Sequence, residues 1–291
     1  MKAGFLMGGG LIVVGLVLEW CVGPVAWDAF AWPVNGWVLA GFVAMVAAVF
    51  LLRNRVGAFR FVGSHQAAIP TLVYAVVLTM VMGLTRQDVH GSWLSNMLTF
   101  WPFVLTYVYM AVILGVVTLR RLSTMRRPSI AHDVGFVLNH CGLLLAMTTA
   151  TLGNADMQRL KMITVVGEPE RRALTQEGAV REMPLEIKLK RFVMETYDDG
   201  SPKRFASEME ILTRTGKRME ATVDVNKPVE VDGWKIYQYG YDTEMGAMSQ
   251  TSILELVSDP WLPLVYAGIY MMLAGAVCLF LFGGRRVKSG K

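Results

Sequence analysis

Six long apolar runs constrain the fold of this chain more than any other feature. Each is about 20 residues long, the length an α-helix needs to cross the ~30 Å hydrocarbon core of a bilayer. Of the 291 residues, 54% are hydrophobic and 18% are charged, which is typical of a membrane protein. We therefore expect a polytopic α-helical membrane protein with about six transmembrane helices. The predicted spans are residues 4–23, 35–52, 66–84, 97–119, 134–152 and 261–283.

The positions of Lys and Arg predict how these helices cross the membrane. If successive helices alternate in direction, one side receives nearly all basic residues outside 153–259, and Arg86 alone faces the other side. The positive-inside rule then places both termini in the cytoplasm and residues 153–259 on the outer side of the membrane. We expect the first run to be retained as a helix. The inner basic residues are Lys2, Arg53, Arg55, Arg60, Arg120, Arg121, Arg126, Arg127, Arg285, Arg286, Lys288 and Lys291.

Charge, cysteine usage and motifs exclude several functions. The net charge of +5 arises from the inner loops, so no nucleic-acid partner is expected. Cys21, Cys141 and Cys278 lie in apolar runs without a CxxC spacing, which argues against disulfides and thiol-redox chemistry. A glycine-rich phosphate loop, a Ser/His/Asp arrangement and HExxH are absent from the sequence. We expect no catalytic residues.

The segment from 153 to 259 changes to the pattern of β-strands. After a polar linker at 156–162, apolar and polar residues alternate in five runs separated by turn-forming residues, which predicts a small antiparallel β domain. The expected organisation is a membrane domain with five helices (1–152), the outer β-rich domain (153–259), and a sixth helix with a basic tail (260–291). The five runs are 184–195, 205–214, 217–225, 234–242 and 251–259.

His140 is the strongest candidate for a functional residue. At ~1.5 Å per residue from Asp133 it lies roughly 10 Å inside the membrane, where an unsolvated ionisable group is costly. One interpretation is a neutral imidazole bonded to a neighbouring helix carbonyl or to Asn139. The other is axial ligation of haem iron, which a neutral imidazole nitrogen commonly provides. We favour haem ligation.

Other residues support less specific interpretations. His65 and His132 are expected at the inner membrane interface, whereas His90, in the outer loop near Trp93, is a weaker candidate for contact with haem or a metal. The pairs Gly135/Gly142 and Gly268/Gly275 favour close helix packing, with a slot for a macrocycle as the alternative. Most tryptophans lie at the outer helix ends, which favours an interfacial belt over the lining of a site for a flat aromatic ligand. These are Trp20, Trp27, Trp32, Trp37, Trp93, Trp101 and Trp261.

Three segments resemble the ResB (CcsB) family of cytochrome c biogenesis proteins. They are FVLNHCGLLLAMTTATLGNADMQRLKMITVVGE, VDVNKPVEVDGWKIYQYGYD and ELVSDPWLPLVYAGIYMMLAGAVCLFLFGGRR, and the similarity covers roughly 133–286. They contain a membrane histidine before Gly-Leu, the pattern N-x-P followed by G-W-x-I-Y-Q, and Asp-Pro before a helix. The family usually has three helices before a much larger outer domain, whereas five helices precede a compact domain here.

The resemblance implies a subunit of the system II machine, which moves haem across the membrane and attaches it to apocytochromes c outside. It also implies a CcsA-type partner and a transient haem shared with it, and the family's proposed haem-ligating histidine falls on His140. The tryptophan-rich WGxxWxWD motif is absent from this sequence, so attachment is expected to belong to the partner and this subunit to be non-catalytic.

A function of a different class is compatible with the same residues. In a haem- or quinone-bearing membrane anchor of a respiratory oxidoreductase, His140 would ligate a permanent electron-transfer haem.

The charge asymmetry predicts the outcome of topology mapping. Reporter fusions at Pro202 are expected to be active outside the cytoplasm, and fusions after Arg127 or Lys291 inside it, because basic loops are retained on the cytoplasmic side. Alkaline phosphatase and green fluorescent protein fusions measure the two faces. A cytoplasmic signal at Pro202 would contradict the predicted orientation of every span.

Overall fold

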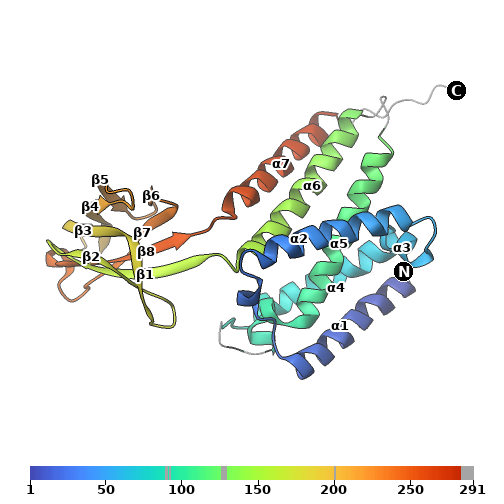
Figure 1. The fold of residues 1–291 in the computed structure, drawn as a ribbon, viewed down its shortest axis with the longest axis horizontal. Helices are drawn as coiled ribbons and strands as arrows, with labels where there is room; N and C mark the ends of the chain where they lie inside the picture. Colours follow the sequence, from blue (N-terminus) through green and yellow to red (C-terminus); the bar gives the residue numbers. More distant parts are fainter. Residues whose placement is uncertain (89–90, 92, 126–129, 200, 283–291) are drawn as a thin grey trace. The chain divides into compact units, whose positions relative to one another are not determined.

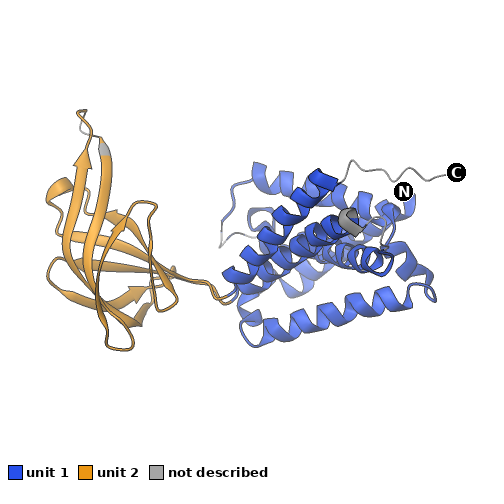
Figure 2. Ribbon diagram, turned by 90° about the horizontal axis from the view of Figure 1, so that it is seen from above, with its two compact units in different colours: residues 1–155, 261–291 blue, residues 156–260 orange. Residues whose placement is uncertain are grey.

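The chain forms two compact units (Figure 2), one of residues 1–155 with 261–291 and one of residues 156–260. The computed structural model describes residues 1–88, 91, 93–125, 130–199 and 201–282.

The first unit is helical, and its six long helices are candidate membrane spans (Figure 1). The predicted number of spans is therefore confirmed, and the protein is a multi-pass membrane protein. Backbone polar groups in hydrocarbon must be satisfied within the chain, which is why these apolar runs become helices. The helices are α1 (Lys2–Val22), α2 (Val34–Leu52), α4 (His65–Leu84), α5 (Trp101–Ser123), α6 (Ile130–Gly153) and α7 (Leu262–Phe282), with a short α3 (Gly57–Val62) between α2 and α4.

The boundaries of α5 differ from the predicted span 97–119. Met97–Thr99 form a separate 3-10 turn, and α5 begins at Trp101 with Pro102 in its first turn, where its missing N–H costs nothing. At the other end the helix continues through Arg120 and Arg121. The apolar run alone did not locate this end because cations are favourable in the last turn of a helix.

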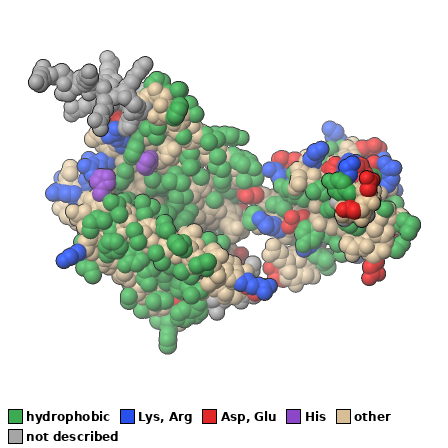
Figure 3. All heavy atoms as spheres, turned by 180° about the vertical axis from the view of Figure 1, so that it is seen from behind, with side chains coloured by type: hydrophobic (Ala, Val, Ile, Leu, Met, Phe, Trp, Pro, Cys, Tyr) green, Lys and Arg blue, Asp and Glu red, His purple; other side chains and the backbone are tan. Residues whose placement is uncertain are grey.

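Helix α5 lies at the centre of the helical unit. Half of its most apolar 18-residue stretch is buried, against at most 17% of the corresponding stretch in each of the other five spans. It contacts α1, α2, α4 and α6. The other helices expose large apolar side chains, such as Leu84 at 85% and Phe280 at 88%, and Figure 3 shows hydrophobic side chains spread over this unit. Lipid tails rather than water suit that surface.

Helices α6 and α7 pack closely through glycines on both helices. A Cβ at Gly268 would lie 2.7 Å from both the Gly142 carbonyl oxygen and the Ala146 nitrogen, and a Cβ at Gly275 would lie 2.6 Å from the Asn139 nitrogen. Small residues permit such an approach of two backbones in a membrane. The packing interpretation of the glycine pairs is confirmed, since the α7 backbone fills the space a macrocycle would need on that face.

The second unit is an eight-stranded antiparallel sheet in the order β5-β4-β3-β2-β1-β8-β7-β6. The predicted antiparallel β domain is therefore confirmed. β1 and β8 pair from Gln158↔Ser258 to Val165↔Thr251, so the two ends of the unit lie side by side. The strands are β1 (Gln158–Val165), β2 (Pro169–Leu174), β3 (Val180–Thr196), β4 (Pro202–Leu212), β5 (Arg218–Asp224), β6 (Val229–Val231), β7 (Trp234–Tyr241) and β8 (Thr251–Ser258).

The sequence missed β1, β2 and β6. The expectation of a polar linker at 156–162 is wrong, because most of that stretch belongs to β1. Leu160 and Met162 point into the core while Arg159 and Lys161 are exposed, so the cations on the outer face concealed the alternation. The core of the unit is formed by Leu160, Met162, Ala173, Met183, Leu185, Ile187, Met209, Ile211, Val223, Val231, Trp234, Ile236, Leu254 and Leu256.

A polar network lies among these apolar side chains. The buried Ser207 hydroxyl donates to Gln238 Oε1 at 2.6 Å, and Gln238 Nε2 donates to the Gly240 carbonyl at 2.9 Å and to Ser252 Oγ at 3.0 Å. The network connects β4, β7 and β8. Buried polar groups that bond one another in this way define one arrangement of the strands, because any other leaves them unsatisfied.

The glycine packing predicts a position-specific effect on stability. Gly268→Leu is expected to destabilise the helical unit by about 1–3 kcal/mol or more, because the added side chain meets the α6 backbone. Thermal unfolding of the detergent-purified full chain measures this. Gly41→Leu in α2 is the matched control, since no atom of the described residues lies within 4 Å of a Cβ at Gly41. Equal unfolding temperatures for the two variants would contradict the close packing of α6 and α7.

Candidate functional site

The candidate site lies on α6, on the side of the helix that faces α5. Asp133, Phe136 and His140 are spaced three and four residues apart, which places them along one face of a helix with 3.6 residues per turn. Further along this face, Thr151 Oγ1 lies 3.2 Å from the Tyr107 hydroxyl of α5. The glycines that contact α7 lie on nearly the opposite side of α6. His140 is therefore separate from the α6–α7 contact.

The imidazole of His140 bonds to its own helix. Its Nδ1 lies 2.9 Å from the Phe136 carbonyl oxygen, one turn earlier. A carbonyl oxygen only accepts, so Nδ1 carries the hydrogen and donates it. In a neutral imidazole the other nitrogen, Nε2, then carries a lone pair. The structure thus gives His140 a helix-carbonyl partner, but within α6 rather than on a neighbouring helix.

Asn139, the alternative partner, points elsewhere. Its Nδ2 lies 3.4 Å from the Met272 carbonyl oxygen of α7. Adjacent residues on a helix are separated by about 100°, which is why Asn139 faces α7 while His140 faces away from it. Asn139 and His140 therefore serve different contacts.

Phe136 supports the ring of His140. The two rings stack with centroids 3.8 Å apart and an interplanar angle of 22°. The guanidinium carbon of Arg121, from the last turn of α5, lies 5.6 Å from the centroid of the same phenyl ring, within the range of a cation–π interaction. The hydrogen bond to the Phe136 carbonyl and the stacking on the Phe136 ring together restrict the orientation of the imidazole.

An ion pair between Arg121 and Asp133 joins α5 to α6 beside these rings. The Asp133 side chain is 3% exposed and that of Arg121 38%. A buried carboxylate is tolerated when a cation and hydrogen bonds compensate its lost hydration. The pair fixes the antiparallel contact of the two helices next to Phe136 and His140.

Sequence reasoning did not find this pair. The sequence places Arg121 among the inner basic residues and Asp133 at the start of the membrane segment, and neither position by itself indicates a partner. The available signal was an acidic residue opening one apolar run and a basic residue closing the previous one, since a helical hairpin brings those positions together.

Within the part of the chain that it describes, the structure gives no binding partner for the other histidines singled out from the sequence. His65 is exposed at the first residue of α4. His132 lies in the first turn of α6, and its side chain lies outside the described residues, as does the whole of His90. The interpretation of His90 as a second contact for haem or a metal stays a prediction.

A cavity of about 280 Å³ lies between α5 and α6 at the end near Trp27. Trp27, Phe103 and Tyr107 line it together with Thr151 and Asn154. The Trp27 indole donates to the Leu98 carbonyl at 3.0 Å. Trp20, Trp32 and Trp37 are instead 70–84% exposed, as an interfacial belt requires.

Part of the chain is similar to known proteins. Residues 129–254 match the ResB-like family. The cytochrome c biogenesis protein CcsB of Prochlorococcus marinus subsp. pastoris is 29% identical over 135 residues, covering 46% of this chain and 30% of the relative. The CcsB proteins of a Synechococcus strain and of Gloeobacter violaceus are 29% identical over 133 residues and 27% identical over 109 residues. The match to the Synechococcus protein covers 45% of this chain and 30% of the relative, and the match to the Gloeobacter protein covers 36% and 23%.

The matched stretch therefore spans less than a third of the length of these relatives. Among solved structures, the cytochrome c haem lyase CcmF overlaps 84% of this chain and 44% of its own, with 15% identity and a TM-score of 0.37. A TM-score this low is no evidence of a shared fold.

The Arg121–Asp133 pair predicts a pattern of stabilities. Arg121→Gln is expected to cost roughly 2–4 kcal/mol of folding free energy, less than a fully buried pair because Arg121 is partly exposed. The loss arises because the buried Asp133 carboxylate is left without its guanidinium. Adding Asp133→Asn to Arg121→Gln is expected to recover part of it. Thermal unfolding of the purified full chain provides the measurement.

Arg120→Gln is the control, since Arg120 bonds only weakly, at 3.2 Å, to the Gly63 carbonyl at an exposed site. Its expected effect is below about 1 kcal/mol. If Arg121→Gln were as stable as Arg120→Gln, the ion pair would have no role in holding α5 against α6.

Proposed function

We propose, from the match of residues 129–254 to the ResB-like family, that this chain is a non-catalytic subunit of a system II cytochrome c maturation complex. In this proposal it holds haem in the membrane through His140, for attachment to apocytochromes c outside. The haem is transient and shared with a CcsA-type partner. The relatives named above are cytochrome c biogenesis proteins, which supports this class of function.

The observation that carries the proposal is the hydrogen bond from His140 Nδ1 to the Phe136 carbonyl. A histidine that ligates a metal usually donates its other ring N–H to a carbonyl or carboxylate, which fixes the tautomer and the ring orientation. His140 has that arrangement, and Nε2 is the nitrogen left to bond iron. The donor chemistry of the site thus fits a haem ligand.

The neighbouring residues have positioning roles in this proposal. Phe136 keeps the imidazole plane fixed, and the Arg121–Asp133 pair keeps α5 against α6 around it. The α7 contact occupies the glycine side of α6, so a bound macrocycle would approach His140 from another side. Bound haem would supply an iron centre of the kind that neutral imidazole ligates.

The rest of the mechanism is assigned to other components. The sequence has no CxxC, no CxxCH and no tryptophan-rich WGxxWxWD motif, so we assign thioether formation to the partner. The β unit is proposed to lie outside a bacterial inner membrane, with both termini in the cytoplasm, because of the distribution of Lys and Arg. Apocytochromes c would then meet the complex on the side of the β unit.

Substitution of His140 tests the proposal. His140→Ala is expected to lower the haem bound per purified complex at least tenfold while the protein still inserts, because it removes the ligand and leaves a cavity of imidazole size. Millimolar imidazole in the growth medium is expected to restore part of the haem, since it supplies the same nitrogen. The measurement is the haem absorbance spectrum per mole of complex, with the partner present.

The control is His65→Ala, which removes an exposed histidine. Its complex is expected to keep the wild-type haem content. If His140→Ala kept it as well, with or without imidazole, His140 would be a packing residue and the ligand would belong to the partner.

A further inference from the structure

The β unit has a hollow on its outer surface that contains two cations beside an aromatic ring. Its volume is about 410 Å³, and it is formed by β1, the end of β2, β7 and β8. Its lining residues are Arg159, Lys161, Leu174, Thr175, Gln176, Tyr239 and Glu255.

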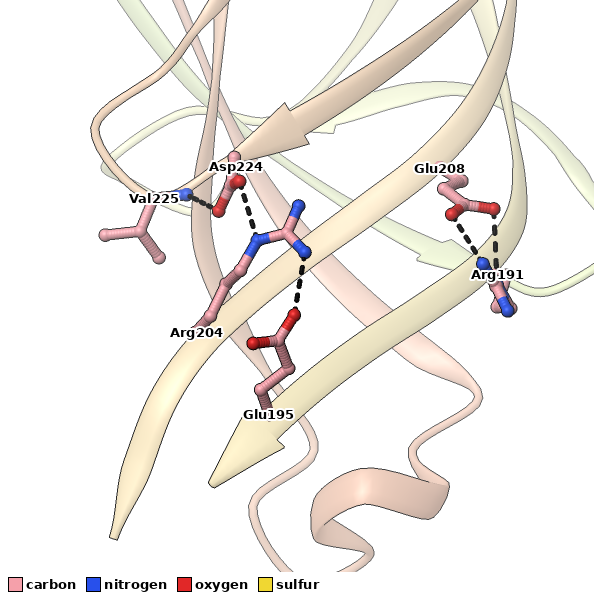
Figure 4. Close-up of polar contacts among 6 residues, drawn as sticks. All are labelled: Arg191, Glu195, Arg204, Glu208, Asp224 and Val225. Carbon is pink, nitrogen blue, oxygen red and sulfur yellow. Dashed lines mark hydrogen bonds and ion pairs between the residues drawn. The ribbon is translucent and has the colours of Figure 1, made fainter. Parts of the chain in front are cut away.

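The cations of the hollow differ from most of the basic side chains on β2 to β5. On β2 to β5, six basic side chains are paired with carboxylates, as Figure 4 shows for Arg191 with Glu208 and for Arg204 with Glu195 and Asp224. The described structure shows no such pair for Arg181, Lys188 or Lys203. Hydrogen bonds from Arg172 lower the pKa of the Glu170 carboxyl to about 2. Within the described part of the chain, Arg159 and Lys161 make no such ion pair. Their charges are available to a ligand.

The strand geometry sets the spacing of the two cations. Arg159 and Lys161 are two residues apart, so both point outward from β1 with Cα atoms about 6.5–7 Å apart. Lys161 Nζ lies 3.9 Å from the centroid of the Tyr239 ring, which holds the ammonium at the hollow. Glu255 is opposite Lys161 in the β1–β8 register, and the three charges sum to +1.

Beside the cations and Glu255, the lining has two polar side chains, Thr175 and Gln176, and two that offer apolar surface, Tyr239 and Leu174. Tyr239 is 53% exposed, and Leu174 lines the hollow. Further along β1, Ile163 is 48% exposed and Val165 37%, on the same face of the strand as Lys161. A ligand that contacts the two cations, Tyr239 and the exposed apolar side chains of β1 would have a flat apolar body and two neighbouring anionic groups at one edge.

We propose that this hollow binds the carboxylate edge of a porphyrin, with Arg159 and Lys161 each contacting one propionate and Tyr239 contacting the ring. The identification of the ligand rests on the haem-handling function proposed above. An acidic peptide could also supply two carboxylates. The porphyrin fits better because the site is a concave hollow with an aromatic wall rather than an extended groove.

The test uses metal-free mesoporphyrin, which has both propionates but no iron to bond a histidine. Binding to the purified full chain in nanodiscs is followed by porphyrin fluorescence. Saturable binding is expected, and Arg159→Gln/Lys161→Gln is expected to weaken it about tenfold, because each exposed charge contact contributes only a few-fold. Glu255→Gln is expected to strengthen binding a few-fold by removing a repelling charge.

Matched variants separate this site from other effects. Lys190→Gln/Arg191→Gln removes two cations from the ion-paired region and is expected to leave porphyrin affinity unchanged. Because metal-free mesoporphyrin has no iron for a histidine to ligate, failure of the haem-ligand proposal remains distinguishable from failure of this one. Each variant is used after size-exclusion chromatography shows a monodisperse protein, and Lys161→Gln alone replaces the double variant if that one does not fold.

Three outcomes would overturn the proposal. One is equal binding of mesoporphyrin to wild type and to Arg159→Gln/Lys161→Gln. Another is equal binding of mesoporphyrin and its dimethyl ester, which lacks the two charges. The third is binding of a glutamate-rich peptide in a manner that depends on Arg159 and Lys161 while mesoporphyrin does not bind, which would assign the hollow to a polypeptide partner.

Discussion

The close contact of α6 with α7 is the constraint on which the arrangement of the membrane unit around His140 depends. Gly142 and Gly268 bring the two backbones so near that a single Cβ does not fit between them. In a membrane, where lipid tails are as apolar as the helices, such van der Waals contact supplies much of the attraction between helices. It also uses one side of α6 completely, so that the histidine is presented on another side, next to α5.

The functional hypothesis depends on how that second side is organised. A histidine within hydrocarbon has two nitrogens to satisfy, and α6 satisfies one of them with its own Phe136 carbonyl. The phenyl ring of Phe136 stacks on the imidazole and restricts its plane, and the Arg121–Asp133 pair holds α5 against α6 beside it. The result is an oriented ring with a defined tautomer, which is the property a metal ligand needs before its metal arrives.

The residues of the β unit divide between a buried interior that builds the fold and a charged outer surface. The motif that suggested the family has structural roles here: Trp234 and Ile236 are buried in the core, and Gln238 bonds across to Ser207 and Ser252. Asn226, in the N-x-P pattern, has a positive φ of 61°, which asparagine tolerates better than most residues. These residues build the fold. The outer face of the sheet carries the charged side chains, some of them in ion pairs and others, such as Arg159 and Lys161, outside the ion pairs of the described residues.

The sequence by itself determined the six spans, the antiparallel β unit and the suspicion that falls on His140, because run length, alternation and burial cost are properties of neighbouring residues. It did not reveal β1, whose outward cations hid the alternation, nor the first residue of α5, which Pro102 sets. Only the tertiary structure decided that Asn139 bonds to α7 while His140 faces α5, that Arg121 meets Asp133, and that Arg159 and Lys161 share a hollow with Tyr239 and Glu255. The physical reason is that such contacts join residues that only the packing of helices or the pairing of strands brings together.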